Sequence, residues 1–408
     1  MARILMAAYT NFRRDPRVRR EAEALVEAGH SVVFLARRQP DEVDRETLCG
    51  VDVIKLPGLT HDRSSILGYL LDYAIFFVLL SLHLTLRPRR YRLIHINNMP
   101  DFLVFATWLP RLLGVPVIHD VHDLMPELYQ EKFGSRRMRW LIGGLELQER
   151  WAARFASAVL TVEDGLKETL SRRGVDARKI HVLMNLPDER IFSPRRGPRF
   201  KGADEPFVLV YHGTLAHRLG LDVAIEALAL ARPALGPVEL RIIGAGEERD
   251  RLIELRDALG LHREVSFSPG FVPVQDIPAM IVDADVGIVP LRASGATDIM
   301  LPTKLLEYVQ LGIPSIVPRT PTIARHFDEQ MVEFFRAGDA ASLAEAIVRL
   351  HRDPGRRALL SGNASSRFGQ AHAWTQHKRI YLDLVDGLLR TTPGQELRAR
   401  SEGRSDAV

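Results

Sequence analysis

Short apolar segments alternate with longer helical patterns along this chain, and the alternation runs through its length twice. Apolar runs bounded by glycine, proline or polar residues are typical of buried strands. Strands that alternate with helices predict a parallel sheet covered by helices on both faces. The strands predicted in the first half are residues 3–9, 31–36, 51–56, 93–97, 115–121, 158–162 and 180–184. Those predicted in the second half are residues 207–211, 238–243, 265–267, 286–291 and 315–317.

A segment without periodicity separates the two halves. Residues 187–206 are rich in proline, glycine and charge, which predicts a linker. At ~150 residues per domain, a chain of 408 residues is long enough for two or three domains. We therefore expect an N-terminal Rossmann-like domain at 1–186 and a C-terminal one at 207–370. A closing helix is predicted at 371–390 and a flexible polar tail at 391–408.

Residues 66–86 are very apolar, which raises the question of a membrane segment. Asp72 interrupts them and leaves 14 residues without formal charge, whereas a spanning helix needs about 18–20. Four arginines follow at once: Arg87, Arg89, Arg90 and Arg92. Two interpretations stay open. One is a helix buried against the sheet, and the other is a helix that lies in a membrane interface and is anchored by these arginines.

The two halves differ in charge. Residues 1–200 carry a formal net charge of +7 and residues 201–408 one of −3, within a total of +4. The basic first half favours an anionic partner, such as phospholipid headgroups, a pyrophosphate-linked substrate or nucleic acid. The alternative is that these arginines lie on solvent-exposed faces and bind no partner, which would give the same net charge.

The composition indicates a cytoplasmic protein. Hydrophobic residues make up 46% and charged residues 26%, which argues against a disordered or polytopic membrane chain. Cys49 is the only cysteine, so no internal disulfide can form and a reducing compartment is expected. The first residues lack the apolar core and cleavage site of a signal peptide.

Candidate ligand-binding residues follow the strands of the second half. Parallel sheets bind ligands at the carboxyl ends of their strands. Gly213 and Thr214 follow the first strand, and Gly213 permits a close backbone approach. Arg218 lies just beyond them and could pair with a phosphate through two hydrogen bonds. Gly244 and Gly246 follow the second strand, but the third glycine of the dinucleotide pattern is missing, so a tight turn explains this pair equally well.

The segment DIMLPTKLLEYVQLGIPSIV gives a stronger indication, because it predicts a helix that begins at the same edge of the sheet. Pro302, Thr303 and Lys304 form its start. The free N–H groups and partial positive charge of a helix N-terminus suit a diphosphate, and Lys304 adds a full charge. Glu307 lies one turn further on the same face, where its carboxylate could accept from two ribose hydroxyls. A Lys–Glu surface pair is the alternative.

The segment VIHDVHDLMPE carries the candidate catalytic residues of the first half. Side chains alternate along a strand, so Asp120 and His122 should face the same side and Asp120 could orient His122. A histidine at this end of a strand suits acid–base work or substrate contact, and a structural histidine bonded to backbone is the alternative. His119 should face the other side, so we expect no metal site here.

Asp283 and Asp285 match the Asp-x-Asp pattern of metal-dependent sugar transferases. They precede a strand, and so lie at the edge opposite to the one that binds ligands. We therefore expect a structural role for both.

Taken in order, these segments resemble the family 4 glycosyltransferases over residues 3–389. The matching segments are DPRVRREAEALVEAGHSV, HINNMPDFLVF, HDVHDLMPE, VYHGTLAHRLGLDVAIEAL, LRIIGAGEERDRL, VSFSPGFVP, ADVGIVPL and LPTKLLEYVQLGIPSIV. The resemblance implies the GT-B fold, an α/β architecture of two Rossmann-like parallel-sheet domains facing across a cleft. It also implies that the closing helix near Trp374 crosses back to the first domain.

The resemblance further implies a nucleotide-sugar donor, UDP- or GDP-linked, on the C-terminal domain and a glycan or polyprenyl-linked acceptor on the N-terminal domain. Arg218 resembles the base that contacts the diphosphate, and Lys304 stands at a phosphate contact. Glu307 matches the second glutamate of a Glu-x7-Glu motif that contacts the ribose. His122 falls where the family has a histidine near the sugar and acceptor.

Three positions depart from the family pattern. The first glutamate of the motif is replaced by Ile299, and the adjacent Asp298 is our candidate substitute. Leu219 stands where the family usually has a lysine, which leaves the charge to Arg218. The first loop lacks the common glycine pair, and its candidates for contact on the acceptor side are Asn11, Arg14 and Asp15.

We therefore expect transfer of a sugar from a nucleoside diphosphate with retention of configuration, without a metal or another cofactor. The expected location is the cytoplasm or the inner face of the cell membrane, on an anionic surface. Two alternatives on the same fold are a nucleotide-sugar hydrolase or epimerase, and a non-catalytic nucleotide-sugar-binding protein. Nucleic-acid binding ranks last, because few aromatic residues lie among the arginines.

Overall fold

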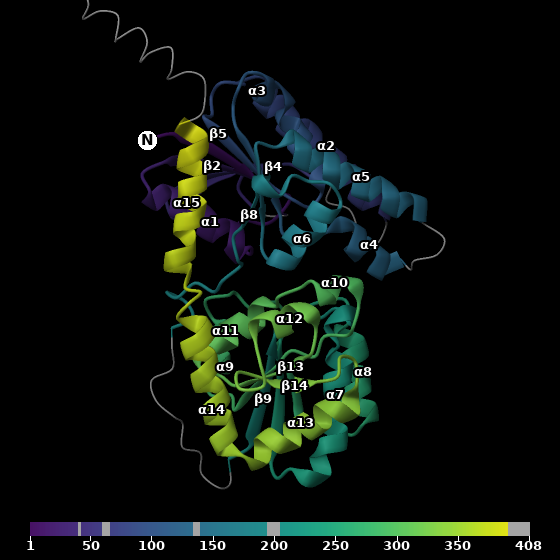
Figure 1. Cartoon of the computed structure of the whole chain (residues 1–408). Helices are drawn as coiled ribbons and strands as arrows, with labels where there is room; N and C mark the ends of the chain where they lie inside the picture. The colour runs from purple at the N-terminus through teal and green to yellow at the C-terminus, as the bar shows by residue number, and fades with distance from the viewer. Residues whose placement is uncertain (40–41, 59–65, 134–138, 194–204, 391–408) are drawn as a thin grey trace, which may run out of the picture. The chain divides into compact units, whose positions relative to one another are not determined.

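The computed structural model describes residues 1–39, 42–58, 66–133, 139–193 and 205–390. The chain forms two compact units (Figure 1). Unit 1 comprises Met1–Met184 together with the chain from Thr375, and unit 2 comprises Asn185–Trp374. Most of the predicted linker, 194–204, lies outside the described residues.

Unit 1 contains an eight-stranded sheet in which only β3 and β4 are antiparallel. The order is β3 (Arg45–Leu48), β4 (Val51–Leu56), β2 (Ser31–Arg37), β1 (Arg3–Ala7), β5 (Leu93–Asn97), β6 (Val117–Val121), β7 (Ala158–Thr161) and β8 (Ile180–Val182). The chain leaves β1 toward β2 and β4, and returns on the other side of β1 at β5. The order therefore reverses between β1 and β5, and such a switch point is where open α/β sheets bind ligands.

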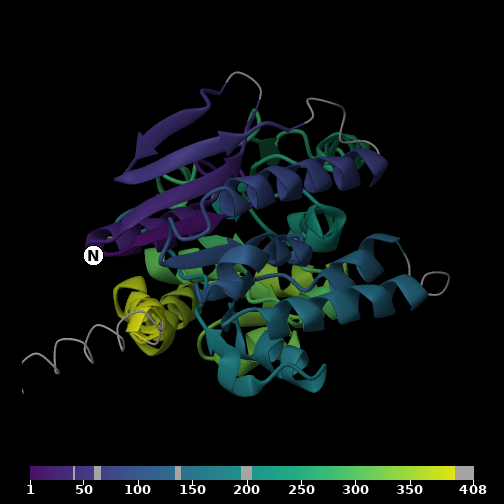
Figure 2. The ribbon, with the colours of Figure 1, turned by 90° about the horizontal axis from the view of Figure 1, so that it is seen from above.

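Helices lie on both faces of this sheet (Figure 1, Figure 2). On one face, α2 (Ile66–Thr85), the 3₁₀ helix η1 (Asp101–Thr107) and α5 (Arg139–Phe155) cover Leu5 and Ile94. On the other face, α1 (Pro16–Glu27) and the closing helix α15 (Trp374–Arg390) contact the sheet through hydrogen bonds to Asp120 and His95. The remaining helices are α3 (Trp108–Leu112), α4 (Met125–Phe133), α6 (Asp164–Arg172) and η2 (Ala177–Lys179).

Unit 2 contains a six-stranded parallel sheet with the same kind of order reversal, here between β9 and β12. The order is β11 (Val265–Phe267), β10 (Val238–Ile243), β9 (Phe207–His212), β12 (Val286–Ile288), β13 (Ser315–Pro318) and β14 (Glu333–Phe335). One face packs against α7 (Leu221–Ala231), α8 (Arg249–Ala258) and α13 (Ala340–Arg352). The other helices are η3 (His217–Leu219), η4 (Arg232–Ala234), α9 (Ile277–Ile281), α10 (Gly295–Asp298), α11 (Thr303–Leu311), α12 (Pro321–His326), α14 (Pro354–Ala364) and η5 (Ser365–Gly369).

The two parallel sheets confirm the fold class predicted from the alternating pattern. Three details differ. Strands β3 and β14 were not predicted, because β3 (RETL) is mostly polar and β14 (EFF) begins with a charged residue, so neither shows an apolar run. The apolar run of residues 101–113, for which the sequence predicts a single helix, forms two short helices, η1 and α3. Helices α4, α5, α6, α10 and α12 were not predicted as separate elements.

Helix α2 has one buried face and one exposed apolar face. Phe76, Leu80 and Leu84 are buried against the sheet, which confirms the buried interpretation for that face. The carboxylate of Asp72 is also buried, where its Oδ2 accepts from Nε of Arg37 at 2.8 Å. The opposite face exposes apolar side chains, all more than half accessible: Leu70, Leu71, Val78, Leu82 and Leu86. None of the helices in the described residues has the length and apolar character needed to cross a membrane.

Candidate functional site

In unit 2 the loops that follow β9 and β10 pack closely against each other and are joined by backbone hydrogen bonds. The N–H of Gly213 donates to the carbonyl of Ile243 at 2.9 Å, and the N–H of Leu215 donates to the carbonyl of Ala245 at 3.0 Å. A Cβ on Gly244 would lie 1.9 Å from the carbonyl oxygen of Gly213, and one on Gly246 would lie 2.1 Å from that of Leu215. Only glycine permits this approach, so Gly244 and Gly246 have a structural reason to be present.

Lys304 lies in the first turn of α11, next to the end of β9. Its side chain is 8% exposed in total, and its Nζ lies 4.9 Å from the centre of the Tyr211 ring. A Cβ on Gly213 would lie 3.4 Å from Cε of Lys304. Burial lowers the pKa of Lys304 to about 8, although the nearby Glu307 charge acts to raise it. The lysine is therefore a buried cation at a helix N-terminus, which excludes the predicted alternative of a Lys–Glu surface pair.

The other predicted donor residues of this edge are more accessible. Gly213 and Thr214 are exposed, whereas Arg218 is half-buried in η3. Burial raises the pKa of Tyr211 and lowers that of Lys304, and the Arg218 charge acts to lower both, so Arg218 lies within electrostatic range of these two residues. Two cations thus border a strand end that exposes backbone.

Glu307 and His212 form a second group at the same edge. Oε2 of Glu307 lies 3.2 Å from Nε2 of His212, the last residue of β9. This contact does not have hydrogen-bond geometry, and His212 Nε2 has no hydrogen-bond partner among the described residues. Burial, with the charge of Lys304, lowers the pKa of His212 to about 3, so the imidazole is neutral. His212 was not among the predicted site residues, although its place at a strand end could have indicated it.

Asp298 and Pro302 flank the turn that leads into α11. Asp298 ends α10, and its backbone carbonyl accepts from the Thr322 hydroxyl at 2.8 Å. Burial raises the pKa of its half-buried side chain. Pro302 is the N-cap of α11, and Thr303 is its first residue.

In unit 1 the predicted pairing of Asp120 with His122 is wrong. Asp120 Oδ2 accepts from Nη1 of Arg17 at 2.6 Å and lies 3.8 Å from Nε2 of His95. Strand β6 ends at Val121, so the alternation used in the prediction does not extend to His122. The backbone N–H of His122 instead donates to Oδ1 of Asn98 at 3.3 Å. Among the described residues, Nδ1 of His122 has no hydrogen-bond partner.

The pKa values in this region follow from burial and from Arg17. Burial, aided by the Arg17 charge, lowers the pKa of His122 to about 3. Burial alone would raise the pKa of Asp120, but the Arg17 guanidinium outweighs it and holds that pKa well below its usual range. At neutral pH Asp120 is therefore a carboxylate and His122 is neutral.

In the first loop of unit 1, Asp15 and Asn11, which were predicted to lie on the acceptor side, make hydrogen bonds within the unit. Asp15 is the N-cap of α1 and accepts from the N–H of Val18 at 3.4 Å. The amide of Asn11 donates to Oε1 of Glu42 at 3.0 Å. Arg14 is exposed.

The structural role predicted for the Asp-x-Asp pair is confirmed. Asp283 accepts from Arg241 at 2.7 Å, and Asp285 accepts from the N–H of Val208 at 2.7 Å at the start of β9. His119, which we expected to face away from His122, lies with Nε2 3.5 Å from Oδ1 of Asp101.

Sequence reasoning missed three residues of unit 1 that the fold brings to Asp120. Arg17 and Glu21 come from α1 and His95 comes from β5. The spacing of Arg17 and Glu21, one helical turn apart, was the available signal. Nothing in the sequence indicated that they meet His95.

Two parallel-sheet units with a cationic, glycine-rich edge define the class of GT-B glycosyltransferases. Two family models match the chain in succession. The first, described as a glycosyl transferase 4-like domain, matches residues 15–185. The second, described as glycosyl transferases group 1, matches residues 206–353. The chain belongs to the family 4 glycosyltransferases.

A curated relative and two solved structures agree with this assignment. The chain is 32% identical over 160 residues to a putative colanic acid biosynthesis glycosyltransferase, WcaL, of Escherichia coli. This match covers 39% of the chain and 38% of the relative, so the chain spans well under half of that protein's length. Sucrose-phosphate synthase of Thermosynechococcus elongatus is similar with a TM-score of 0.76 and 20% identity, covering 96% of this chain and all of that one. HepE of Anabaena, in complex with UDP-glucose, has a TM-score of 0.70 and 17% identity and covers 95% and 100%. At these identities the two structures show the fold.

Proposed function

We propose that this protein transfers a glycosyl group from a UDP- or GDP-linked sugar to a glycan or polyprenyl-linked acceptor, with retention of configuration. The observation that carries the proposal is Lys304, an ammonium group buried at the start of α11 beside the exposed backbone of Gly213. Such a cation at a helix N-terminus favours an anionic ligand, and the diphosphate of a nucleotide sugar is an anion of this kind. The UDP-glucose bound by HepE and the assignment of WcaL to colanic acid biosynthesis support these substrate classes.

The departing diphosphate is stabilised by fixed positive charge. In the proposed reaction Lys304, Arg218 and the first N–H groups of α11 meet the negative charge that develops on the leaving oxygen. These groups neutralise the diphosphate without a metal ion. Full activity in excess chelator is the expected result, and activity restored only by a divalent cation would contradict this part of the proposal.

Glu307 is the proposed ribose contact. Its carboxylate lies one turn beyond Lys304 and next to the neutral His212, so it can accept from ribose hydroxyls at the same edge. No carboxylate of this edge is proposed as a nucleophile, and attack on the same face of the sugar gives retention without a covalent intermediate. The anomeric configuration of the product, measured by NMR, tests this step.

His122 is proposed to contact the donor sugar or the acceptor hydroxyl. With a pKa of about 3 it is neutral and a poor general base at neutral pH. A neutral imidazole still offers one N–H donor and one acceptor nitrogen. Contact with the substrate is therefore favoured over uptake of the acceptor proton.

The direct test is a thermal-shift series with UDP, GDP, ADP and their common sugar conjugates. A ligand at ~100-fold above Kd should stabilise the protein by roughly 2.7 kcal/mol. We expect a shift with UDP or GDP compounds that Glu307→Ala reduces. Glu345→Ala serves as the matched control, because this glutamate is exposed on α13. Equal shifts for all three proteins would contradict the assignment of Glu307.

Turnover assays separate the alternatives on this fold. Release of free sugar without an acceptor would indicate a hydrolase, and interconversion of the nucleotide sugar would indicate an epimerase. Donor binding without turnover in the presence of lipid-linked acceptors would indicate a binding protein.

We also propose that unit 1 docks on the anionic inner face of the cell membrane. Helices α2, α3 and α5 of unit 1 (Figure 1) expose large apolar side chains. We call these residues the apolar surface: Leu70, Leu71, Val78, Leu82, Leu86, Trp108, Leu112, Trp140, Leu147 and Trp151. Tryptophan and leucine next to basic residues are typical of interfacial membrane contact.

Basic residues border the apolar surface at the end of α2. Arg87, Arg89 and Arg92 are exposed. Cations at the edge of an apolar surface are attracted to anionic headgroups by ~1 kcal/mol each. A lipid-linked acceptor would then be presented to unit 1 at the membrane.

Vesicle sedimentation tests the docking. Wild type should bind vesicles that contain phosphatidylglycerol more strongly than vesicles of phosphatidylcholine alone. Replacing Arg87, Arg89, Arg90 and Arg92 by glutamine should remove the preference, and Trp140→Ser with Trp151→Ser should weaken binding to both. Partition unchanged by either set would contradict the proposal.

A further inference from the structure

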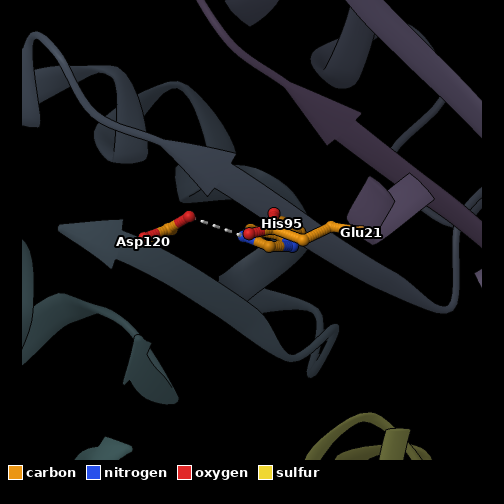
Figure 3. Close-up of side chains that lie close together, drawn as sticks. All are labelled: Glu21, His95 and Asp120. Atoms are coloured by element: carbon orange, nitrogen blue, oxygen red, sulfur yellow. Dashed lines mark ion pairs between the residues drawn. The ribbon is translucent and has the colours of Figure 1, made fainter. Parts of the chain in front are cut away.

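A cluster of charged side chains is buried in unit 1 beneath the ends of β5 and β6. It contains Arg17 and Glu21 from α1, His95 from β5 and Asp120 from β6, each at most 5% exposed. Figure 3 shows Glu21, His95 and Asp120 directed toward one another. Their carboxylate and imidazole atoms lie within 4.8 Å of each other. Burial of so many ionisable groups is costly unless their charges balance.

The cluster connects four elements of unit 1. Nη1 of Arg17 donates to Asp120 on β6, and its Nη2 donates to Oδ1 of Asn97 on β5 at 3.3 Å. Nδ1 of His95 lies 2.8 Å from the hydroxyl of Tyr381 on α15, in a hydrogen bond whose direction depends on the tautomer. The closing helix is thereby joined to the central strands.

The same contacts lead directly to His122. Asn98 follows Asn97, and its Oδ1 accepts from the N–H of His122. The amide Nδ2 of Asn98 donates to the carbonyl of Asp123 at 2.7 Å. Arg17 thus joins Asn97 of β5 to Asp120 of β6. The next residue of the chain after Asn97, Asn98, holds the backbone of His122.

Two atoms inside the cluster lack partners among the described residues. Oε2 of Glu21 and Nε2 of His95 are buried without a hydrogen bond. Arg17 and Asp120 already compensate each other, so within the cluster an ionised Glu21 would be a second carboxylate against one guanidinium, with the buried Arg20 as the other cation that acts on it. A proton on Glu21 removes this charge and supplies an O–H donor for a neighbouring acceptor.

The electrostatic surroundings agree with a protonated Glu21. Burial, and next the charge of Asp120, raise the pKa of Glu21 to about 8, against the lowering effect of Arg17 and Arg20. Burial lowers the pKa of His95, so its imidazole is neutral. The ionisable groups that face Glu21 from the surrounding elements are Asp15, Arg17 and Arg20 of α1 and its N-cap, His95 of β5, Asp120 of β6 and Tyr381 of α15.

A divalent cation is the competing occupant, since a glutamate, a histidine and an aspartate are common ligands. The guanidinium of Arg17 lies 2.6 Å from Oδ2 of Asp120, so a bound metal ion would share this carboxylate with a second cation. Charge repulsion at this distance in a buried site favours the proton.

We propose that Glu21 is a neutral carboxylic acid that completes a charge-balanced cluster with Arg17, His95 and Asp120, and that this cluster positions His122. The positioning role rests on the proposed function of His122, whereas the protonation of Glu21 does not. Glu21→Gln imitates the neutral acid and is therefore the informative variant. Glu27→Gln is its matched control, because Glu27 lies on the same helix and pairs with Lys378 at the surface.

The first experiment measures Tm of the full-length protein from pH 5 to pH 9. A raised pKa means that the folded state binds a proton more tightly than the unfolded state, so stability falls as pH rises from the unfolded value near 4.5 to about 8. Glutamine has no such proton. Glu21→Gln and wild type should therefore have similar Tm values at pH 5, and the variant should exceed wild type increasingly toward pH 8. Glu27→Gln should follow the wild-type curve.

Two results would overturn the protonation. One is a Glu21→Gln variant that is less stable than wild type at pH 8, which would show that the carboxylate charge is required. The other is a stoichiometric divalent metal in the purified protein whose removal lowers Tm. Infrared spectroscopy adds a direct reading, because the carbonyl band of a protonated carboxylic acid should be present in wild type and lost in Glu21→Gln.

The second experiment measures transfer kinetics. Glu21→Gln should keep kcat at pH 7, whereas Glu21→Ala should lower kcat by tenfold or more with donor KM unchanged, because the donor residues lie in unit 2. Equal loss in both variants would contradict the positioning role. If no donor is turned over by wild type, the proposed function fails, but the Tm curves still decide the protonation of Glu21.

Discussion

The two units have related strand orders, but their switch-point edges are built by different means. In unit 2 glycines allow the loops after β9 and β10 to pack backbone against backbone, and Lys304 and Arg218 border an exposed strand end. In unit 1 the corresponding strands end over a buried set of ion pairs in which Arg17 is matched by Asp120.

This difference agrees with the roles proposed for the two edges. An edge that receives a mobile anion needs cations whose charge is completed only by the ligand. An edge that holds a neutral histidine in place needs its own charges balanced, because an uncompensated charge nearby would shift the pKa of that histidine. The comparison can be tested by removing a charge or a glycine from each unit.

Removing the Arg17 cation should have the largest effect. Arg17→Met leaves Asp120 and its surroundings buried without their counter-charge, which typically costs about 3–5 kcal/mol. Because Arg17 holds the pKa of Asp120 well below its usual ~3.9, the stabilisation is present above that pH and is lost in wild type only as the pH falls through the still lower folded value. In Arg17→Met the lowering effect of Arg17 is gone and burial acts to raise the pKa of Asp120, so the variant takes up a proton in acid. Urea unfolding should therefore show a smaller difference in stability between variant and wild type at pH 4 than at pH 7.

The control for Arg17 is Arg178→Met. Arg178 pairs with Asp176 but is 91% exposed, so its loss should leave the unfolding midpoint unchanged. A similar loss of stability in both variants would mean that arginine content, rather than the buried pair, stabilises unit 1.

Removing the cation of unit 2 should instead lower activity while the fold is kept. Lys304→Met should reduce kcat/KM for the donor by ~10²–10³-fold, the usual effect of losing one group that stabilises transition-state charge. Arg352→Met, an exposed cation at the end of α13, is the control. If Lys304→Met lost stability but kept kcat/KM, Lys304 would have a structural role, like the buried charges of unit 1.

Much of the unit 2 edge could be predicted from the sequence because its residues occupy element ends. Gly213 follows an apolar strand, and Pro302 and Lys304 begin a helix with a clear period, so local sequence specifies their place. The buried position of Lys304 over Tyr211 could not be predicted, since it depends on how α11 packs against β9.

The unit 1 edge was less accessible to prediction. Asp120 was recognised, but it was assigned to the wrong partner, because the end of β6 at Val121 is set by tertiary packing. Arg17, His95 and Tyr381 are far apart in sequence and meet only when α1 and α15 cover the same face of the sheet. A periodic pattern reports which face is buried and carries no information on which polar side chains meet there.

Adding a methyl group between the two loops of unit 2 should be the next most damaging change. Gly244→Ala places a Cβ 1.9 Å from the Gly213 carbonyl at a residue with φ of +145°, so we expect a loss of about 2–3 kcal/mol and weaker donor binding. Gly260→Ala is the control, since it has φ of +67° but no atom within 4 Å of the added Cβ. Equal losses would show that backbone strain, rather than the close approach of the loops, explains Gly244.

The pH dependence of donor binding provides a finer test of Lys304. Its pKa of about 8 means that the free protein loses this charge as pH rises through 8, whereas a bound diphosphate keeps the lysine protonated. Donor Kd should therefore increase about tenfold per pH unit above pH 8, equal to ~1.4 kcal/mol per unit. Lys304→Arg should bind independently of pH over this range, and a pH-dependent arginine variant would assign the titration to another group.

The smallest effect concerns the anchoring of the closing helix to unit 1. Tyr381→Phe removes the hydroxyl bonded to Nδ1 of His95 and should cost about 1 kcal/mol, because a buried ring nitrogen loses its partner. Lys378 lies on α15 as Tyr381 does, and it forms a half-exposed ion pair with Glu27 of α1. Lys378→Met removes this pair and should cost less. Hydrogen exchange of the α15 amides should be faster in Tyr381→Phe than in Lys378→Met. The reverse order would mean that surface charge, rather than the buried cluster, holds α15 to unit 1, and the cluster would then act on His122 alone.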